Sequence, residues 1–98
     1  MIKIEITEIY EKWFNKLKDL KAKDIINIRL RRIEITGNFG DHKNIGDGLY
    51  EVRVHYGAGY RLYFCNRGVQ WILILCGGNK SSQVKDIKKA REIIKEIT

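Results

Sequence analysis

The stretch VRVHYGAGYRLYF, residues 52–64, decides the fold of this 98-residue chain. Apolar and polar side chains alternate on both sides of the glycine-rich residues 57–59, and a period of two is typical of half-buried β-strands. The glycines favour a turn between the strands, because glycine adopts positive φ at little cost. We therefore predict a β-hairpin with strands over 49–56 and 60–66.

The hydrophobic pattern also predicts the pairing within this hairpin. A three-residue turn brings Val54 opposite Leu62 on one face and His55 opposite Arg61 on the other. A register shifted by one residue would place apolar side chains against polar ones, so the pattern favours the three-residue turn. Arg53 falls on the same face as Arg61. The hairpin is thus predicted to have one apolar face and one face with two arginines and a histidine.

Apolar residues at helical or alternating spacing predict the remaining elements. In chain order these are a short strand near 2–6, helices over about 7–19 and 22–36, a strand over 69–76, and a helix from about Ser82. Thr7 suits the N-cap of the first helix, and Gly37 suits the left-handed C-terminal cap of the second.

The element order β-α-α-β-β-β-α predicts an α+β fold in a single domain, residues 1–98. The strand over 69–76 is apolar on both faces, so it should lie inside a sheet that is covered on each side. From the register we expect Ile72 and Ile74 on the face of Arg61. The residues expected on the apolar face of the hairpin are Trp71, Leu73 and Leu75.

Two N-terminal helices should then cover one face of an antiparallel sheet, and the C-terminal helix should partly cover the other. This arrangement leaves a groove with Arg53, His55 and Arg61 on its floor and Lys80 at its rim. Arginine is always charged and forks onto phosphate oxygens. Histidine titrates near neutral pH and exchanges protons. The groove is therefore a candidate site for phosphate chemistry.

Composition limits the classes of partner. Lys and Arg number 19 against 12 Asp and Glu, a formal net charge of +7 that favours an anionic partner such as nucleic acid or an acidic protein segment. No stretch approaches the roughly 18 apolar residues of a membrane span, and the N-terminus lacks the apolar segment of a signal peptide. We expect a cytoplasmic protein that binds no membrane.

Two cysteines, Cys65 and Cys76, are too few for a disulfide framework, and we expect both to be buried and reduced. No His and Cys residues occur at the spacing of a metal site. We therefore expect no metal and no cofactor.

Two longer motifs resemble a known family. They are GNFGDHKNIGDGLYEVRVHYGAGYRLYF, residues 37–64, and LILCGGNKSSQVKDIKKA, residues 73–90. Together with the element order they resemble the RelE/ParE toxin superfamily of bacterial toxin–antitoxin modules, in particular its HigB-like branch of phage-derived addiction module killer proteins. The resemblance covers nearly the whole chain.

The resemblance implies a RelE-like fold and a toxin of a type II toxin–antitoxin module. Such toxins are mostly ribosome-dependent endoribonucleases that need no metal and cut mRNA in the decoding site. A cognate antitoxin, expected to be a small helix-turn-helix protein, would hold the toxin inactive. The alternative within the superfamily is a ParE-type toxin that inhibits DNA gyrase by binding, and a third possibility is a module that only interacts or has degenerated.

The resemblance also suggests site residues. Arg61 matches the arginine of the family's Gly-Tyr-Arg turn, Arg53 a basic residue on the preceding strand, and Lys80 the basic residue after the last strand. The tyrosine that RelE carries in its C-terminal helix is missing, because this chain has Val84-Lys85-Asp86 there.

His55 and Lys43 are candidates to replace the missing tyrosine, because of their placement alone. The predicted catalytic residues are Arg61, Arg53, Lys80 and His55. The predicted RNA-binding residues are Lys43, Arg53, Arg61, Lys80 and Lys85. A purely structural alternative is that Arg53 pairs with Glu51 or with a carboxylate of the last helix, and that His55 is a hydrogen-bonded edge residue.

Overall fold

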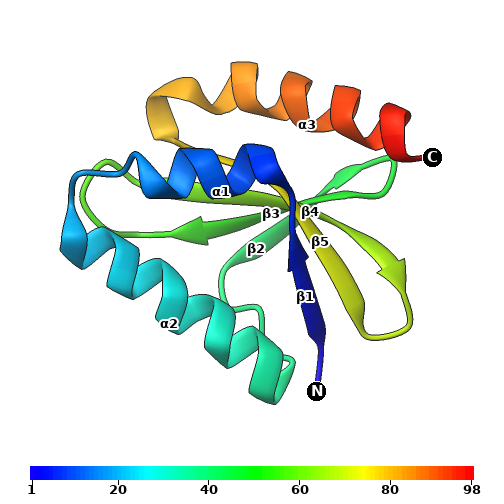
Figure 1. Cartoon of the computed structure of the whole chain (residues 1–98), viewed down its shortest axis with the longest axis horizontal. Helices are drawn as coiled ribbons and strands as arrows, with labels where there is room; N and C mark the ends of the chain where they lie inside the picture. Colours follow the sequence, from blue (N-terminus) through cyan, green and yellow to red (C-terminus); the bar gives the residue numbers. More distant parts are fainter.

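The chain folds into one five-stranded sheet with helices on both faces, and the computed structural model describes all residues from 1 to 98 (Figure 1). Its elements are β1 (Lys3–Ile6), α1 (Glu8–Asn15), α2 (Leu20–Thr36), β2 (His42–Gly46), β3 (Leu49–Val54), β4 (Tyr60–Gly68), β5 (Trp71–Asn79), a 3₁₀ turn (Lys80–Ser82) and α3 (Gln83–Ile97). The predicted α+β class is confirmed. No helix combines the length and apolar character needed to cross a membrane.

The strands lie in the order β1-β5-β4-β3-β2, and β1 runs parallel to β5 while the other neighbours are antiparallel. The prediction missed β2. Its segment is rich in glycine and polar residues and lacks alternation, because an exposed edge strand buries almost no side chains. The backbone of β3 holds β2 in place instead.

The predicted register of the hairpin is wrong by two residues. Val54 lies opposite Tyr60, and Arg53 lies opposite Arg61. The connection is therefore a five-residue loop, 55–59, in which Gly59 N donates to Tyr56 O and two glycines adopt positive φ. Because the shift is even, each side chain still lies on its predicted face. The consequence is that two arginines stand directly opposite one another.

The predicted faces of β5 are reversed. The turn between β4 and β5 lies at Val69–Gln70 rather than at Arg67–Gly68, and two irregularities interrupt the pairing of the strands. The irregularity between Asn66 and Gly68, the one nearer the turn, moves the side chains that follow on β5 to the other face. As a result Ile72 and Ile74 lie in the core under α1 and α2, and Leu75 lies under α3.

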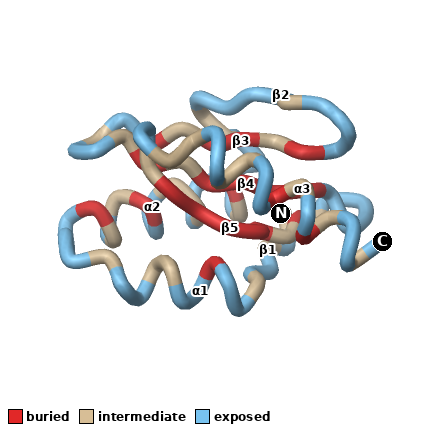
Figure 2. The backbone as a smooth tube through the Cα atoms, turned by 90° about the horizontal axis from the view of Figure 1, so that it is seen from above, coloured by how far each residue is buried: buried red, intermediate tan, exposed pale blue.

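Two hydrophobic cores fill the space on either side of the sheet. The larger one contains 11 buried residues and lies under α1 and α2, and the smaller contains 7 and lies under α3. Figure 2 shows the buried residues running along the central strands β3, β4 and β5. Thr7 and Gly37 cap α1 and α2 as predicted. Both cysteines are buried free thiols, and burial raises the pKa of Cys76 to about 12.

Candidate functional site

A buried carboxylate organises the polar face of the hairpin. Glu51 on β3 is fully buried, its Oε1 accepts a hydrogen bond from Arg53 Nε at 2.9 Å, and its Oε2 accepts one from Gln83 Nε2 at 2.9 Å. Arg61 Nε lies 3.9 Å from Oε2. Burial alone would raise the pKa of Glu51, but the hydrogen bonds from Arg53 and Gln83 hold it below its ordinary value. Glu51 therefore stays charged and ties both arginines to the first turn of α3.

The two arginines differ in how much of each faces solvent. The side chain of Arg53 is 29% exposed, and that of Arg61 is 12% exposed. Arg61 Nε is buried and has no hydrogen-bond partner. A guanidinium has five N–H donors and remains charged. The exposed part of Arg53, and to a lesser extent that of Arg61, can therefore bind an anion from the solvent side.

His55 begins the loop between β3 and β4 and forms a second carboxylate pair. Its Nε2 lies 2.5 Å from Asp41 Oδ2, and this hydrogen bond lowers the pKa of Asp41. Arg53 N donates to the backbone oxygen of Asp41, which places the pair beside the arginines. The His55 side chain is 70% exposed. Because Asp41 occupies Nε2, the other ring nitrogen is left free for a ligand.

The predicted residues Lys43 and Lys80 lie at the edges of this group. Lys43 on β2 lies opposite Glu51, and opposed residues of an antiparallel pair share one face. Lys80 follows β5, where its backbone N donates to Ala58 O in the loop that contains His55. We call Arg53, Arg61, Glu51, Gln83, Asp41 and His55 the arginine cluster.

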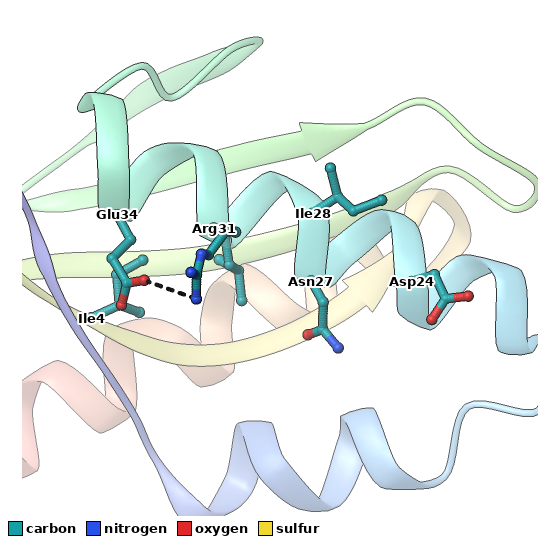
Figure 3. Close-up of a pocket in the computed structure, with 7 residues that line it drawn as sticks. Ile4, Asp24, Asn27, Ile28, Arg31 and Glu34 are labelled. Atoms are coloured by element: carbon teal, nitrogen blue, oxygen red, sulfur yellow. Dashed lines mark ion pairs between the residues drawn. The ribbon is translucent and has the colours of Figure 1, made fainter.

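The predicted residue Lys85 lies elsewhere. It lines a groove of about 390 Å³ between α1 and α3, away from the arginine cluster. The largest cavity, about 690 Å³, also lies apart from it, between β1 and α2, where Arg31 and Glu34 form an exposed ion pair (Figure 3). No three His, Cys, Asp or Glu side chains converge in a way that could hold a metal ion.

The sequence prediction missed three members of the arginine cluster as functional residues. Glu51 was expected only as a structural alternative partner of Arg53, and the structure shows that this ion pair forms. Alternation did place Glu51 on the face of Arg53, so its proximity was predictable. Gln83 and Asp41 carried no comparable signal, because their positions depend on where α3 starts and how the loop after Gly40 runs.

We expect stability to fall on acidification because of Glu51. Its folded pKa lies below the ordinary value of 4.5, so the unfolded chain binds the proton first. The stabilisation is present above that value and is lost as pH falls through the folded pKa. The thermal midpoint should therefore drop as the pH falls below about 4.5, and the drop should be smaller in Glu51→Gln. If the thermal midpoint falls equally with pH in the wild type and in Glu51→Gln, Glu51 is not the cause of the acid sensitivity.

Comparison with known sequences gives a family match. The family described as Phage derived protein Gp49-like matches residues 12–97. A protein of Haemophilus influenzae, known only as an uncharacterized protein, is 45% identical over 96 residues, which make up 98% of this chain and 96% of the relative.

Solved structures share the fold. The isolated E. coli RelE toxin superposes with a TM-score of 0.66 at 18% identity, covering 89% of this chain and 99% of RelE. A chain of the intact E. coli RelBE toxin–antitoxin complex superposes with a TM-score of 0.66 at 16% identity, covering 81% of this chain and 96% of the matched chain. A chain of the YoeB–YefM toxin–antitoxin complex of Staphylococcus aureus superposes with a TM-score of 0.57 at 18% identity, covering 78% of this chain and 93% of the matched chain. At these identities the likeness concerns the fold, and the predicted RelE-like fold is confirmed.

Proposed function

Since the chain belongs to the phage-derived Gp49-like family and has a RelE-like fold, we propose that it is the toxin of a type II toxin–antitoxin module that cuts mRNA on the ribosome. Residues 1–98 would act as one toxin domain of the HigB-like branch. The observation that carries the proposal is the arginine cluster, where two guanidiniums lie beside one buried carboxylate and remain partly exposed. Fold alone would not support it, because one fold hosts many functions.

The proposed reaction needs no group beyond the RNA and the protein. The 2′-oxygen of one nucleotide attacks the adjacent phosphorus, the bond from phosphorus to the 5′-oxygen breaks, and a 2′,3′-cyclic phosphate and a 5′-hydroxyl result. Charge accumulates on the phosphate oxygens in the transition state. Arg61 and Arg53 would stabilise this charge, because their positions are set before the substrate arrives.

His55 is the group best suited to move a proton in this scheme. Asp41 holds Nε2, which orients the ring, as a carboxylate does in other His-containing sites. The free nitrogen would take the proton from the 2′-hydroxyl. Lys80, at the end of β5, would contact the phosphate or supply a proton to the 5′-oxygen, and Lys43 would bind the RNA backbone.

The proposed partner is a cognate antitoxin, a small helix-turn-helix protein. Two of the similar structures are toxin–antitoxin complexes, which supports this assignment. The net charge of +7 favours an antitoxin segment rich in acidic residues, with complementary charge acting on association rate and specificity more than on affinity. The proposed location is the cytoplasm, where translating ribosomes are found.

Brief induction of the protein without its antitoxin tests the proposal. We expect translation to stop and new mRNA ends to appear within translated regions, and both effects should be absent when the adjacent antitoxin gene is co-expressed. If translation continues while DNA gyrase is trapped on cleaved DNA, the protein is a gyrase inhibitor and the nuclease proposal fails.

A further inference from the structure

The groove between α1 and α3 results from the unequal lengths of the strands at this edge of the sheet. β1 ends at Ile6, opposite Ile74, so it does not reach the last residues of β5. The chain turns into α1 at this point, and residues of α1, α3 and the end of β5 line the groove. Figure 1 shows α1 and α3 at this end of the sheet. A Cβ on Gly77 would overlap the ring of Trp13, so the glycine allows α1 to pack directly on β5.

Lysines dominate the walls of this groove. Lys12 extends from α1, Lys16 from its C-cap, and Lys85 and Lys89 from α3, while Asp86 is the single acidic residue in the lining. Asp86 is already engaged, because it accepts a hydrogen bond from Ser82 Oγ. Lys12 forms one exposed ion pair with Glu8 at 3.5 Å, and such pairs contribute little. The groove therefore keeps a strong positive charge, and we call it the lysine groove.

The arginine cluster, in contrast, is largely neutralised from within. Arg53 and Arg61 face Glu51, and Asp41 lies beside Arg53, so the formal charges of these four groups cancel. A site of this kind can position a phosphate but adds little long-range attraction for a polyanion. Attraction must come from charge that is not already paired, and the lysine groove provides it.

The composition of the lysine groove favours a nucleic-acid backbone over a protein segment. Only three of its nine lining residues are hydrophobic, whereas grooves that accept apolar anchors are lined predominantly by hydrophobic residues. The lysines on each helix are spaced by four residues, about 6 Å along the axis. Two rows of flexible point charges suit a chain of phosphates, which requires charge along its length rather than a fixed apolar pocket.

We propose that the lysine groove binds the phosphodiester backbone of single-stranded RNA, as a docking surface separate from the arginine cluster. This proposal rests on the proposed function only in that it takes RNA as the ligand. Docking there would supply affinity, while the arginine cluster would act on the phosphate to be cut. The first turn of α3 lies between the two, with Gln83 toward Glu51 and Lys85 toward the groove.

The test measures binding of the full chain to a fluorescent 2′-O-methyl RNA 12-mer, which lacks the 2′-hydroxyl and is not cleaved by the proposed reaction. One variant carries Lys→Gln at all four lysines of the groove. The matched control carries Lys→Gln at four exposed lysines elsewhere, Lys3, Lys18, Lys88 and Lys95. Both lose the same net charge. Thermal melting checks that each variant folds.

We expect the groove variant to lower the slope of log affinity against log salt by about 3, because each phosphate contact on a single strand contributes about 0.7. The slope of the control variant should stay within about 1 of the wild-type slope. Equal slopes in the two variants would overturn the proposal, as would an acidic peptide of equal charge that binds the groove more tightly than the RNA. The 2′-O-methyl RNA cannot be cut, so its binding does not depend on cleavage. If the protein binds this RNA but cleaves no mRNA, the proposed nuclease function fails and the proposed docking surface stands.

Discussion

Arg61→Ala is expected to reduce mRNA cleavage by about 100-fold to 1,000-fold, the loss that follows removal of one preorganised donor to a transition-state oxyanion. The fold should persist, because Glu51 keeps its hydrogen bonds from Arg53 and Gln83. Arg61→Lys should recover only part of the activity, because a lysine has the charge but lacks the planar fork. Cleavage is measured by mapping mRNA ends after induction, and folding by thermal melting of the purified variant.

Leu62→Ala is the control for a purely structural effect on the neighbouring residue. Leu62 is fully buried in the larger core, so its truncation should lower the free energy of unfolding by about 2–5 kcal/mol. Cleavage per folded molecule should stay near that of wild type. If Arg61→Ala melts like wild type and cuts mRNA at the wild-type rate, Arg61 has no part in the reaction.

Glu51→Ala is expected to lower the free energy of unfolding by about 3–5 kcal/mol, the effect of removing one partner from a buried ion pair. Without this carboxylate, Arg53 and Arg61 would face each other across β3 and β4 with no charge between them. Gln83 would lose its contact as well, which loosens the first turn of α3. Chemical denaturation of both proteins measures the difference.

Glu51→Gln separates the two roles of the carboxylate. It keeps the shape of the side chain and removes its charge, so it should be less destabilising than Glu51→Ala and still reduce cleavage, because the arginines are no longer held by an anion. A Glu51→Ala protein that unfolds within about 1 kcal/mol of wild type would show that solvent or movement of the arginines replaces the carboxylate at no cost.

The sequence was sufficient to predict elements that depend on local patterns. Alternation located the hairpin, helical spacing located α1, α2 and α3, and cap residues located the ends of two helices. The sequence was insufficient where the register of a strand depends on the strand beside it. The pairing of β4 with β5 contains two irregularities that no spacing rule reveals, and the one nearer the turn places Ile72 and Ile74 on the face opposite to the predicted one.

For the candidate site, the sequence located the charged side chains but not their partners. Arg53, Arg61 and His55 were predicted on one face, and the structure places all three at one end of the sheet. Their pairing with Glu51 and Asp41 depends on a loop and on the start of α3, which are set by tertiary packing. Lys85 was also predicted to bind RNA, and it lies in the groove between α1 and α3 rather than in the arginine cluster.

The parallel pairing of β1 with β5 has a consequence for how the protein folds during synthesis. Thr7, directly after β1, donates to Leu75 O, a residue 68 positions later in the chain. The first strand therefore leaves the ribosome long before its partner exists. At about 5–20 residues per second, the delay is roughly 3–14 s. During this time the arginines of β3 and β4 have no α3 beside them, so a nascent chain cannot assemble the site until its synthesis is nearly complete.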